Sequence, residues 1–428
     1  MNVEKLVDWN LWWESGKVSE ELQGKKRQEY KELSDSIGVK EVTIITGIRR
    51  CGKSTLMYQM IDNLLKKGIK PENILFVNLE DKKLSQDSLD DIYNEYRKKM
   101  NLEEKAYVFL DEIHKRKEWE YWIRKKYDLK TNDKFVISGS CSYLLKKEYS
   151  ALLTGRNLSY KVSTLDFREF LAFKGLKVDD KKISKGIITE KTKIQISKYF
   201  DEYLNFGGFP EVLFKEENFK TKLLSQYFDD ILYKDIVDRH NLNSEKAKDL
   251  ALFFMNNFTG LISLRNIRNA LGMSYDTTKD YLSYFREAFL FSTIDHFSYS
   301  FKEQKTLPSK IYTIDNGLRN SVSFKFSKDE GKLAENLVFV ELKRRGFYPY
   351  YWKGKKEVDF IVKNKDQSLN AMNVCYGDEI DEREIEGLNK FKEEFSKTKK
   401  LMIITKDVEK VDGGIEFIPL WKWLLKNH

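Results

Sequence analysis

Eight residues near the start of the chain have the types and spacing of a phosphate-binding loop. They run from Gly47 to Ser54, read GIRRCGKS, and fit the pattern G-x-x-x-x-G-K-[ST]. A glycine-framed loop allows backbone N–H groups to surround a phosphate, and the N-terminus of the next helix adds positive potential. In such a loop Lys53 reaches the β- and γ-phosphates, and the Ser54 hydroxyl ligates Mg²⁺. The predicted nucleotide-binding residues are Gly47, Ile48, Arg49, Arg50, Cys51, Gly52, Lys53, Ser54 and Thr55.

The residues on either side of the loop place it between a strand and a helix. The apolar run 42–45 precedes the loop and predicts a buried strand. After Ser54, apolar residues recur at positions 56, 57, 60, 61, 64 and 65, which is the spacing of one helical face. This is the context that the phosphate-binding motif requires, whereas an ordinary strand–turn–helix is the alternative.

A pair of acidic residues follows another predicted strand. The segment 107–110 is apolar, and Asp111 and Glu112 come directly after it. The carboxyl ends of parallel strands are where open α/β sheets bind ligands. We therefore expect Asp111 to hold Mg²⁺ through water, and Glu112 to orient or deprotonate the attacking water.

Further candidates lie where a γ-phosphate would be. The strand predicted over 135–140 ends in small polar residues, of which Ser138 or Ser140 could hydrogen-bond the attacking water or the γ-phosphate. A plain strand end is the alternative. Arg156 lies in a polar turn, where it could reach the γ-phosphate of a neighbouring subunit or form a local salt bridge.

A tryptophan cluster opens the chain. Trp9, Trp12 and Trp13 require burial, and basic residues including Arg27 follow. The cluster either covers an edge of the nucleotide-binding domain or lines the adenine side of the site.

The composition is that of a globular chain with several domains. The 428 residues suffice for about two to four domains, and 41% hydrophobic residues exclude wholesale disorder. The 76 basic and 67 acidic side chains give a net charge of +9, which permits contact with an anionic polymer without requiring it. Three distant cysteines and four scattered histidines form neither a disulfide framework nor a metal pattern. Without a signal-peptide core or a run of about eighteen apolar residues, the chain is expected to be soluble and cytoplasmic.

The middle of the chain is predicted to be helical. After the nucleotide-binding domain ends near residue 170, helices are expected over 171–245, interrupted by the turn Phe206–Pro210. The two glycines of this turn indicate either a backbone packed tightly against another element, as in a lid over the nucleotide, or turn chemistry alone.

Three short helices followed by strand-like sequence over 246–300 predict a winged helix-turn-helix. The preceding helix offers Arg265 and Arg268 for phosphate contacts. Two aspartates in the recognition helix argue against base readout, so both DNA binding and packing against protein remain open. The exposed start of the recognition helix would present Tyr275, Asp276, Thr277, Lys279 and Asp280.

The last region, 306–428, reads as a further α/β unit. Glu335 on a helix and Asp359 on a hairpin strand form the skeleton of a restriction-endonuclease-like core. Such a core requires a further acid and a lysine on the next strand. Asn373 and Cys375 stand at those positions, so we expect a degraded nuclease fold that is retained for binding or assembly.

Taken together, these motifs carry a family resemblance over nearly the whole chain. They are Trp9-Asn10 with Trp13, Thr46–Arg50 with Gly52-Lys53-Ser54, Phe109–Ile113 with Trp119, Ser138–Ser140, Leu153–Arg156, Gly207–Pro210, and Glu335-Asn336 with Glu357–Phe360. In these residues the chain resembles the prokaryotic AAA-type ATPases, abundant in archaea, that join a P-loop domain to a winged helix and a C-terminal restriction-endonuclease-like domain. The resemblance implies ATP binding, ATP hydrolysis and assembly into oligomers.

The prediction is therefore an α/β protein with a P-loop parallel-sheet domain over 1–170, a helical lid over 171–245, a winged helix over 246–300 and a restriction-endonuclease-like domain over 306–428. It binds ATP and Mg²⁺ and hydrolyses ATP, and its nucleotide state rearranges the C-terminal half. DNA and further copies of the chain are the candidate partners, and a membrane is not. The alternatives are a slow nucleotide-dependent signalling switch with a protein-interaction C-terminal half, and an ATP-dependent nuclease.

Overall fold

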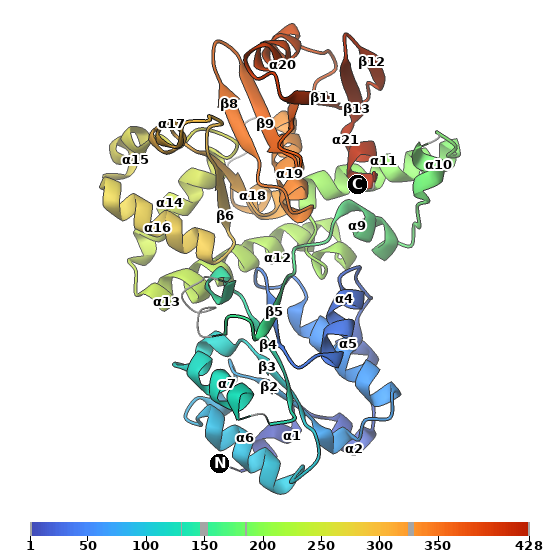
Figure 1. Ribbon diagram of the computed structural model, residues 1–428, viewed down its shortest axis with the longest axis vertical. Coiled ribbons are helices and arrows are strands. Elements are labelled where there is room, and N and C mark those ends of the chain that lie inside the picture. Colours follow the sequence, from blue (N-terminus) through green and yellow to red (C-terminus); the bar gives the residue numbers. More distant parts are fainter. Residues whose placement is uncertain (1, 130, 146–152, 185, 324–328, 427–428) are drawn as a thin grey trace. The chain divides into compact units, whose positions relative to one another are not determined.

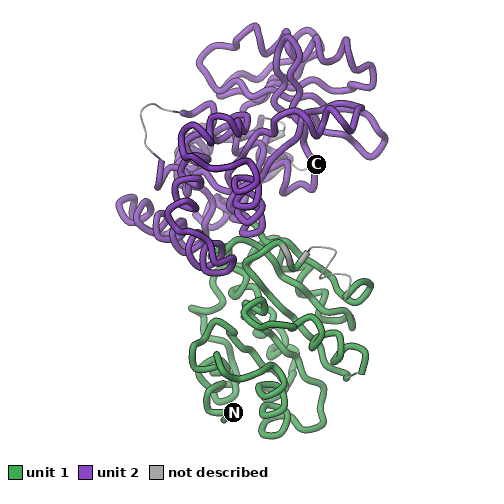
Figure 2. The backbone as a smooth tube through the Cα atoms, turned by 90° about the vertical axis from the view of Figure 1, so that its left-hand side faces the viewer, with its two compact units in different colours: residues 1–163 green, residues 164–428 purple. Residues whose placement is uncertain are grey.

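The computed structural model describes residues 2–129, 131–145, 153–184, 186–323 and 329–426. The chain forms two compact units, residues 1–163 and 164–428 (Figure 2). The helices and strands are labelled in Figure 1. Among the described residues, no helix combines the length and the apolar character needed to cross a membrane.

The first unit is built on a parallel five-stranded sheet in the order β2-β3-β4-β1-β5. Its strands are β1 (Val42–Thr46), β2 (Ile74–Asn78), β3 (Tyr107–Asp111), β4 (Lys134–Gly139) and β5 (Asn157–Lys161). The described helices are α1 (Glu4–Val7), α2 (Trp12–Ser15), α3 (Glu20–Gln23), α4 (Tyr30–Asp35), α5 (Lys53–Lys66), α6 (Leu89–Lys99) and α7 (Trp119–Asp128). The predicted α/β class is confirmed.

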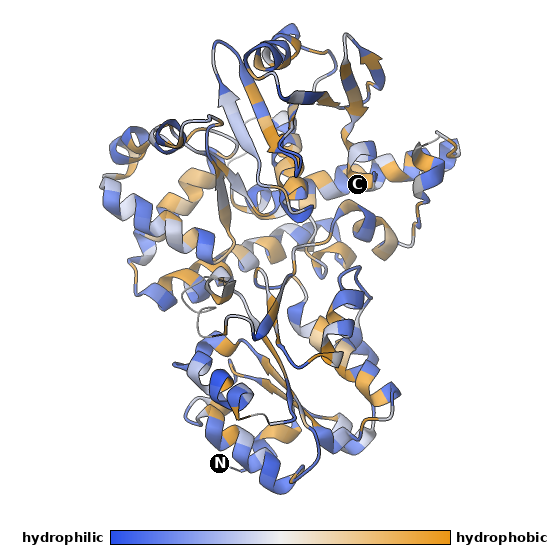
Figure 3. Cartoon of the chain, in the orientation of Figure 1, coloured by the Kyte–Doolittle hydropathy of each residue, from blue (hydrophilic) through white to orange (hydrophobic). Residues whose placement is uncertain are grey.

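The order of the strands follows from the connections between them. From β1 the chain crosses through α5 to the far edge at β2, and then returns strand by strand through α6 and α7. Because parallel crossovers are right-handed, the reversal of direction puts α5 on one face of the sheet and α6 and α7 on the other (Figure 1). The central strands are buried on both faces and apolar (Figure 3). Because the strands are parallel, the carboxyl ends of β1, β3 and β4 lie at the same edge of the sheet.

The N-terminal segment covers the exposed edge of this sheet. The Asn10 side chain accepts a hydrogen bond from the Phe76 N–H at 2.7 Å and donates one to the Phe76 carbonyl at 2.9 Å. The indole N–H groups of Trp12 and Trp13 both donate to the Ile74 carbonyl. Since Phe76 and Ile74 belong to edge strand β2, the tryptophan cluster covers an edge, which is the first of the two alternatives.

The second unit contains a helical region, a two-stranded ribbon and a mixed sheet. Its N-terminal helices are α9 (Phe167–Phe173), α10 (Asp180–Ser184), α11 (Glu190–Phe206), α12 (Glu217–Asp230), the π-helix η7 (Ile231–Val237) and α13 (Asp238–His240). The middle elements are α14 (Ser244–Asn256), α15 (Leu264–Leu271), α16 (Tyr275–Glu287), β6 (Phe291–Ile294), α17 (Phe301–Thr306), β7 (Lys310–Thr313) and α18 (Asn316–Val322). The C-terminal elements are α19 (Glu330–Arg344), β8 (Tyr350–Lys353), β9 (Glu357–Lys363), β10 (Leu369–Cys375), α20 (Glu382–Glu394), β11 (Thr398–Thr405), β12 (Lys410–Asp412), β13 (Ile415–Pro419) and α21 (Leu420–Leu425).

Three capped helices and a ribbon make up the middle of this unit. The Ser263 and Ser274 hydroxyls cap α15 and α16, and Gly272 ends α15 in the left-handed conformation. Strand β6 pairs antiparallel with β7. The sequence had placed the β7 segment at the start of the C-terminal region, and the structure corrects this, because the pairing joins β7 to the ribbon that follows α16.

The C-terminal sheet has six strands in the order β12-β13-β11-β10-β9-β8. Strands β8, β9 and β10 form an antiparallel meander, and β10, β11 and β13 run parallel. Residues alternate along β9 between two hydrophobic clusters, with Phe360 in one and Ile361 in the other. Helix α19 contributes to the first cluster and α20 to the second, so both faces of the sheet are covered.

The two glycines of the Phe206–Pro210 turn pack against backbone and carboxylate within the second unit. A Cβ atom on Gly207 would lie 1.9 Å from Asp315 Oδ1, and one on Gly208 would lie 2.3 Å from the Leu165 carbonyl oxygen. Gly208 N–H donates to Asp315 at 2.8 Å. The alternative of a tightly packed backbone therefore holds, because no side chain fits at either position.

Replacing Gly208 by alanine should destabilise the second unit. The new methyl group would overlap the Leu165 carbonyl, and overpacking of this kind costs about 1–3 kcal/mol of unfolding free energy. Chemical denaturation measures the change. Gly331→Ala is the matched control, because nothing lies within 4 Å of its Cβ position and alanine favours the first turn of α19. Equal stability of the two variants would contradict the packing argument.

Candidate functional site

The phosphate-binding loop joins the end of β1 to the start of α5. Two glycines are required by its geometry: a Cβ on Gly47 would lie 2.1 Å from the Val162 carbonyl oxygen, and Gly52 has a φ of +102°. Lys53 is buried, and its ammonium donates to the carbonyl oxygens of Gly47 at 3.0 Å and Ile48 at 3.1 Å. The loop therefore curls around the lysine ammonium.

Asp111 at the end of β3 is held by two hydroxyl groups. Ser54 Oγ donates to its Oδ2 at 2.6 Å, and Ser138 Oγ donates to its Oδ1. Burial raises the pKa of Asp111 and so does the neighbouring Glu112, while the two hydroxyls and Lys53 oppose them. A carboxylate and a hydroxyl in direct contact are the oxygen ligands that Mg²⁺ prefers. The described residues contain no group of three or more acidic, His or Cys side chains placed for a metal.

Glu112 is the next residue and points back toward the loop. It adopts a left-handed conformation with φ of +54°, and its N–H donates to Ser138 Oγ at 3.2 Å. Its carboxylate accepts from Ser140 N–H at 3.2 Å, lies 3.3 Å from His114 Nδ1, and stands 3.9 Å from Lys53 Nζ. The strained backbone thus turns this carboxylate toward the lysine instead of letting it continue along the strand.

The two serines at the end of β4 occupy different places: Ser138 lies in the strand and Ser140 directly follows it. Ser138 bridges Asp111 and the Glu112 backbone, so it organises the acidic pair. Ser140 is fully buried, and its Oγ makes no hydrogen bond within the described part of the chain. A buried hydroxyl of this kind is costly unless another group satisfies it, so Ser140 fits the predicted role beside a bound phosphate or water.

Arg156 lies at the other end of the sheet. It directly precedes β5, whose first residue pairs with Val42 at the start of β1, whereas the loop follows the end of β1. Its Nε donates to Asp128 at 3.0 Å. Within one molecule the structure therefore makes Arg156 a local salt-bridge residue, and its predicted action on a neighbouring subunit stays a prediction.

Two arginines support the loop: Arg49, which belongs to the predicted site, and Arg27, which lies outside it. Arg49 donates two 3.0 Å hydrogen bonds to the Glu80 carboxylate, just beyond β2. Burial alone would raise the pKa of Glu80, but Arg49 and Lys115 outweigh it and lower this pKa to about 2. Arg27 donates to the carbonyl oxygens of Cys51 at 3.1 Å and Ser163 at 2.7 Å. The sequence does not reveal the Arg49–Glu80 ion pair or the hydrogen bonds of Arg27, because each joins segments that are distant along the chain.

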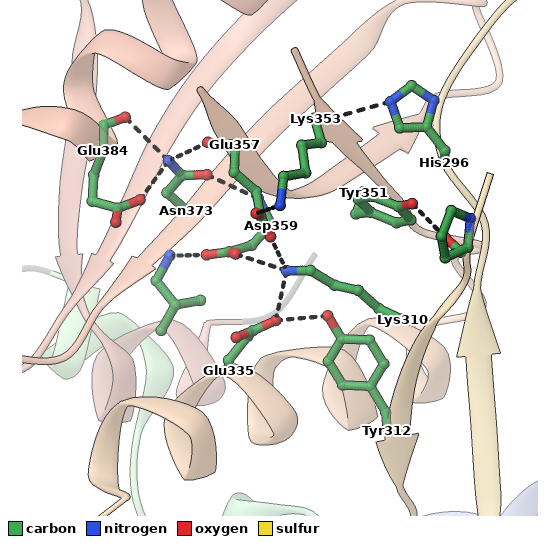
Figure 4. Close-up of polar contacts among 12 residues, drawn as sticks. His296, Lys310, Tyr312, Glu335, Tyr351, Lys353, Glu357, Asp359, Asn373 and Glu384 are labelled. Atoms are coloured by element: carbon green, nitrogen blue, oxygen red, sulfur yellow. Dashed lines mark hydrogen bonds and ion pairs between the residues drawn. The ribbon is translucent and has the colours of Figure 1, made fainter. Parts of the chain in front are cut away.

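In the second unit, the predicted Glu335 and Asp359 meet around a lysine (Figure 4). Lys310 Nζ lies 3.2 Å from Glu335, 3.2 Å from Asp359 and 2.7 Å from Glu357. Burial alone would lower the pKa of Lys310, but the surrounding acidic groups raise it well above its ordinary value. Sequence reasoning missed Lys310, since it enters from β7 and not from the strand where the nuclease pattern has its lysine.

Asn373 occupies the position where the nuclease pattern has an acid. Its side-chain oxygen accepts from Asp359 N–H at 3.0 Å, and its amide donates to Glu384 at 2.8 Å (Figure 4). A carboxylate could not make the second contact, because it has no proton to donate. Burial and the nearby Asp359 raise the pKa of Glu384 to about 7. The amide thus belongs to a connected polar network.

Family models match three consecutive parts of the chain. Residues 39–171 match the model described as "AAA domain". Residues 197–329 and 330–423 match two models described as domains of unknown function, DUF8612 and DUF4143. The first match contains the loop, the acidic pair and the two serines.

Relatives extend over nearly the whole chain. The uncharacterized protein MJ1544 of Methanocaldococcus jannaschii is 35% identical over 409 residues, covering 90% of this chain and 88% of the relative. An uncharacterized protein of Haemophilus influenzae is 31% identical over 395 residues, covering 90% and 94%. Among solved structures, the Walker-type ATPase PABY2304 of Pyrococcus abyssi is similar with a TM-score of 0.46 and 12% identity, over 72% of this chain and 97% of that one.

Replacing Glu335 by glutamine should change how stability depends on pH. Burial, together with Asp359, raises the pKa of Glu335 from near 4.5 to about 7, although Lys310 and Tyr312 oppose the shift. The folded protein therefore holds this proton more tightly than the unfolded chain, and its contribution to stability is present below pH 4.5 and is lost as pH rises to about 7.

The measurement is the unfolding free energy of wild type minus that of Glu335→Gln at several pH values. We expect this difference to fall between about pH 4.5 and pH 7 and to stay constant above. Glu393→Gln, which changes an exposed residue of α20, serves as the control. A difference that is flat across this range, or rises, would refute the argument.

Proposed function

Because this chain belongs to a family of AAA-type ATPases that includes the uncharacterized protein MJ1544, we propose that it is a Mg²⁺-dependent ATPase whose nucleotide state drives rearrangement of its C-terminal half. The observation that carries the proposal is the contact between Ser54 and Asp111 at 2.6 Å, with Lys53 and Glu112 beside it. Two residues from the start of α5 and two from the end of β3 meet there, and each has a role in phosphoryl transfer.

The loop would bind the phosphates through its backbone and Lys53. The Lys53 ammonium, which rests on two loop carbonyl oxygens, would exchange these contacts for the β- and γ-phosphate oxygens. Ser54 and Asp111 would hold Mg²⁺, which when bound neutralises charge that develops on the phosphates. Arg49 is tied to Glu80 and keeps the first part of the loop in place.

Glu112 would act on the attacking water. Its carboxylate is fixed by Ser140 N–H and lies near His114, so it can orient a water molecule and accept a proton from it. The Ser140 hydroxyl would contact the same water or the γ-phosphate. Positioning and charge stabilisation supply most of the catalysis in phosphoryl transfer, and these residues supply both.

ATP hydrolysis would change the conformation of the second unit. We propose a helical lid, followed by a winged helix from α14 to β7 and a restriction-endonuclease-like domain from α19 onward. The β6–β7 ribbon supports the winged helix, because such a hairpin follows the recognition helix in that motif. Assembly of several copies and contact with DNA are part of the proposal. ATPase activity measured with and without duplex and single-stranded DNA, on a sample of known mass, tests both.

We further propose that the cluster around Lys310 is structural and does not cleave DNA. Lys310 neutralises the carboxylates where a nuclease would hold a metal, and Asn373 replaces an acid. Nicking of plasmid DNA with Mg²⁺ or Mn²⁺ that disappears in Asp359→Ala would contradict this.

Lys53→Ala should lose ATP binding. The variant removes the charge that reaches the β- and γ-phosphates, and charged hydrogen bonds of this kind correspond to about 10- to 100-fold in affinity. Titration calorimetry with ATP and Mg²⁺ measures the loss. Lys66→Ala, at the exposed end of the same helix, should bind as wild type does. Undiminished ATP binding by Lys53→Ala would refute the assignment of Lys53 to the β- and γ-phosphates.

Glu112→Gln should bind ATP and fail to turn it over. The amide keeps the size of the side chain but cannot accept the proton of the attacking water. We expect kcat to fall by about 100-fold or more with affinity little changed, as measured by phosphate release and by calorimetry on the same sample. A variant with near-normal turnover would show that Glu112 is not the catalytic base.

A further inference from the structure

The second unit contains a groove of about 830 Å³ that the proposed ATPase chemistry does not use. One wall is a face of α16, and the others are the segment 261–264, the end of β6, the segment 305–309 and the segment 348–350. The walls are tied together by backbone hydrogen bonds: Tyr351 N–H donates to the Asp295 carbonyl at 3.2 Å, and Phe297 N–H donates to the Tyr351 carbonyl at 2.6 Å. The groove is therefore a preformed feature of the fold.

The charge of the lining is positive. Its basic side chains are Lys279, Arg286, Lys305 and Lys343. Among the described lining residues the one carboxylate is Asp295, which is neutralised by Lys305 at 2.7 Å and accepts from Ser309 Oγ at 2.8 Å. A lining of this composition concentrates anions.

Exposed aromatic rings accompany these charges. Tyr275 and Tyr348 line the groove with 57% and 76% of their surface exposed, and Tyr350 lies beside them. The Lys343 ammonium lies 4.1 Å from the centre of the Tyr348 ring. Cations beside exposed aromatic rings match a polymer of phosphates and flat bases, because every base can stack on an aromatic face.

The two aspartates at the start of α16, which argue against base readout, do not line the groove. The residues of α16 that line the groove include Tyr275, Lys279 and Arg286, which recur at helical spacing. Asp276 and Asp280 are not among the lining residues, because they follow Tyr275 and Lys279 by one position and so lie about 100° around the helix. The helix thus directs Tyr275, Lys279 and Arg286 into the groove and its carboxylates elsewhere.

We propose that this groove binds single-stranded nucleic acid. Duplex DNA is disfavoured, since reading a major groove requires a helix face that projects freely, and this face of α16 is opposed by the segments 305–309 and 348–350. A single strand lies along such a channel with phosphates on the cations and bases on the tyrosines. The inference deepens the nucleic-acid part of the proposed function and does not depend on ATP hydrolysis.

The test uses the full chain without nucleotide. Fluorescence anisotropy with a labelled oligothymidylate of about 20 nucleotides measures affinity at about 50 mM and about 200 mM salt, beside a duplex of equal length. We expect tighter binding of the single strand. Tyr348→Ala should weaken it by about 5- to 100-fold, and Lys279→Ala should lower the slope of log affinity against log salt by about 0.7.

Controls separate this result from misfolding and from failure of the nucleotide site. Both altered side chains are exposed, and Tyr275→Ala provides a second test of stacking if either variant is unstable. Lys248→Ala removes an exposed charge on α14 outside the groove and should leave affinity unchanged. ATP turnover is read on the same samples, and Lys53→Ala should still bind the oligonucleotide. No binding, equal or tighter binding of the duplex, or variants that all bind as wild type does would overturn the proposal.

Discussion

A buried carboxylate persists in a folded protein only when hydrogen-bond donors or cations replace the water that it loses, and Asp111 sets this requirement at the centre of the first unit. Ser54 and Ser138 meet it: Ser54 lies at the start of α5, which follows β1, and Ser138 lies in β4, the neighbour of β3. In the strand order β2-β3-β4-β1-β5, β4 lies beside β3 and β1 lies beside β4. Ser138 of β4 and Ser54 of the helix after β1 can therefore both reach the Asp111 carboxylate. The nucleotide site is therefore a consequence of the topology as much as of the motif.

The same requirement is met differently in the second unit. There Glu335, Glu357 and Asp359 gather around a single ammonium group, and Lys310 comes from a ribbon that precedes the C-terminal sheet in sequence. Removing a cation from such a cluster is strongly destabilising, since it leaves buried charge uncompensated. The lysine therefore ties β7 to β9 and α19. The acids that a nuclease would use for a metal here join the ribbon to the sheet.

The sequence predicted those parts of the fold in which local pattern and chemistry agree. The glycine loop and the apolar strands before it and before Asp111 were visible, because each depends on a few neighbouring residues. Strand β5 was not predicted, since its residues are mostly polar and it pairs only at the edge of the sheet. The location of Arg156 followed from that strand and was equally hidden. The partner of β7 could not be read from its own sequence, because pairing is decided by another segment.

The groove shows why residue types alone were misleading for α16. The first residues of α16 include two aspartates, but the residue types alone do not say which face of the helix each one occupies. On a helix, neighbours in sequence differ by about 100°, so acidic and basic residues can alternate along the chain and still lie on separate faces. Which face matters is decided by what stands opposite, and here the opposing segments 305–309 and 348–350 select the face with Lys279 and Arg286. The same segments narrow the space in front of the helix, so they favour a single strand over a duplex as the partner. Charge and steric limits thus arise from one arrangement, in which the segments 305–309 and 348–350 stand opposite α16.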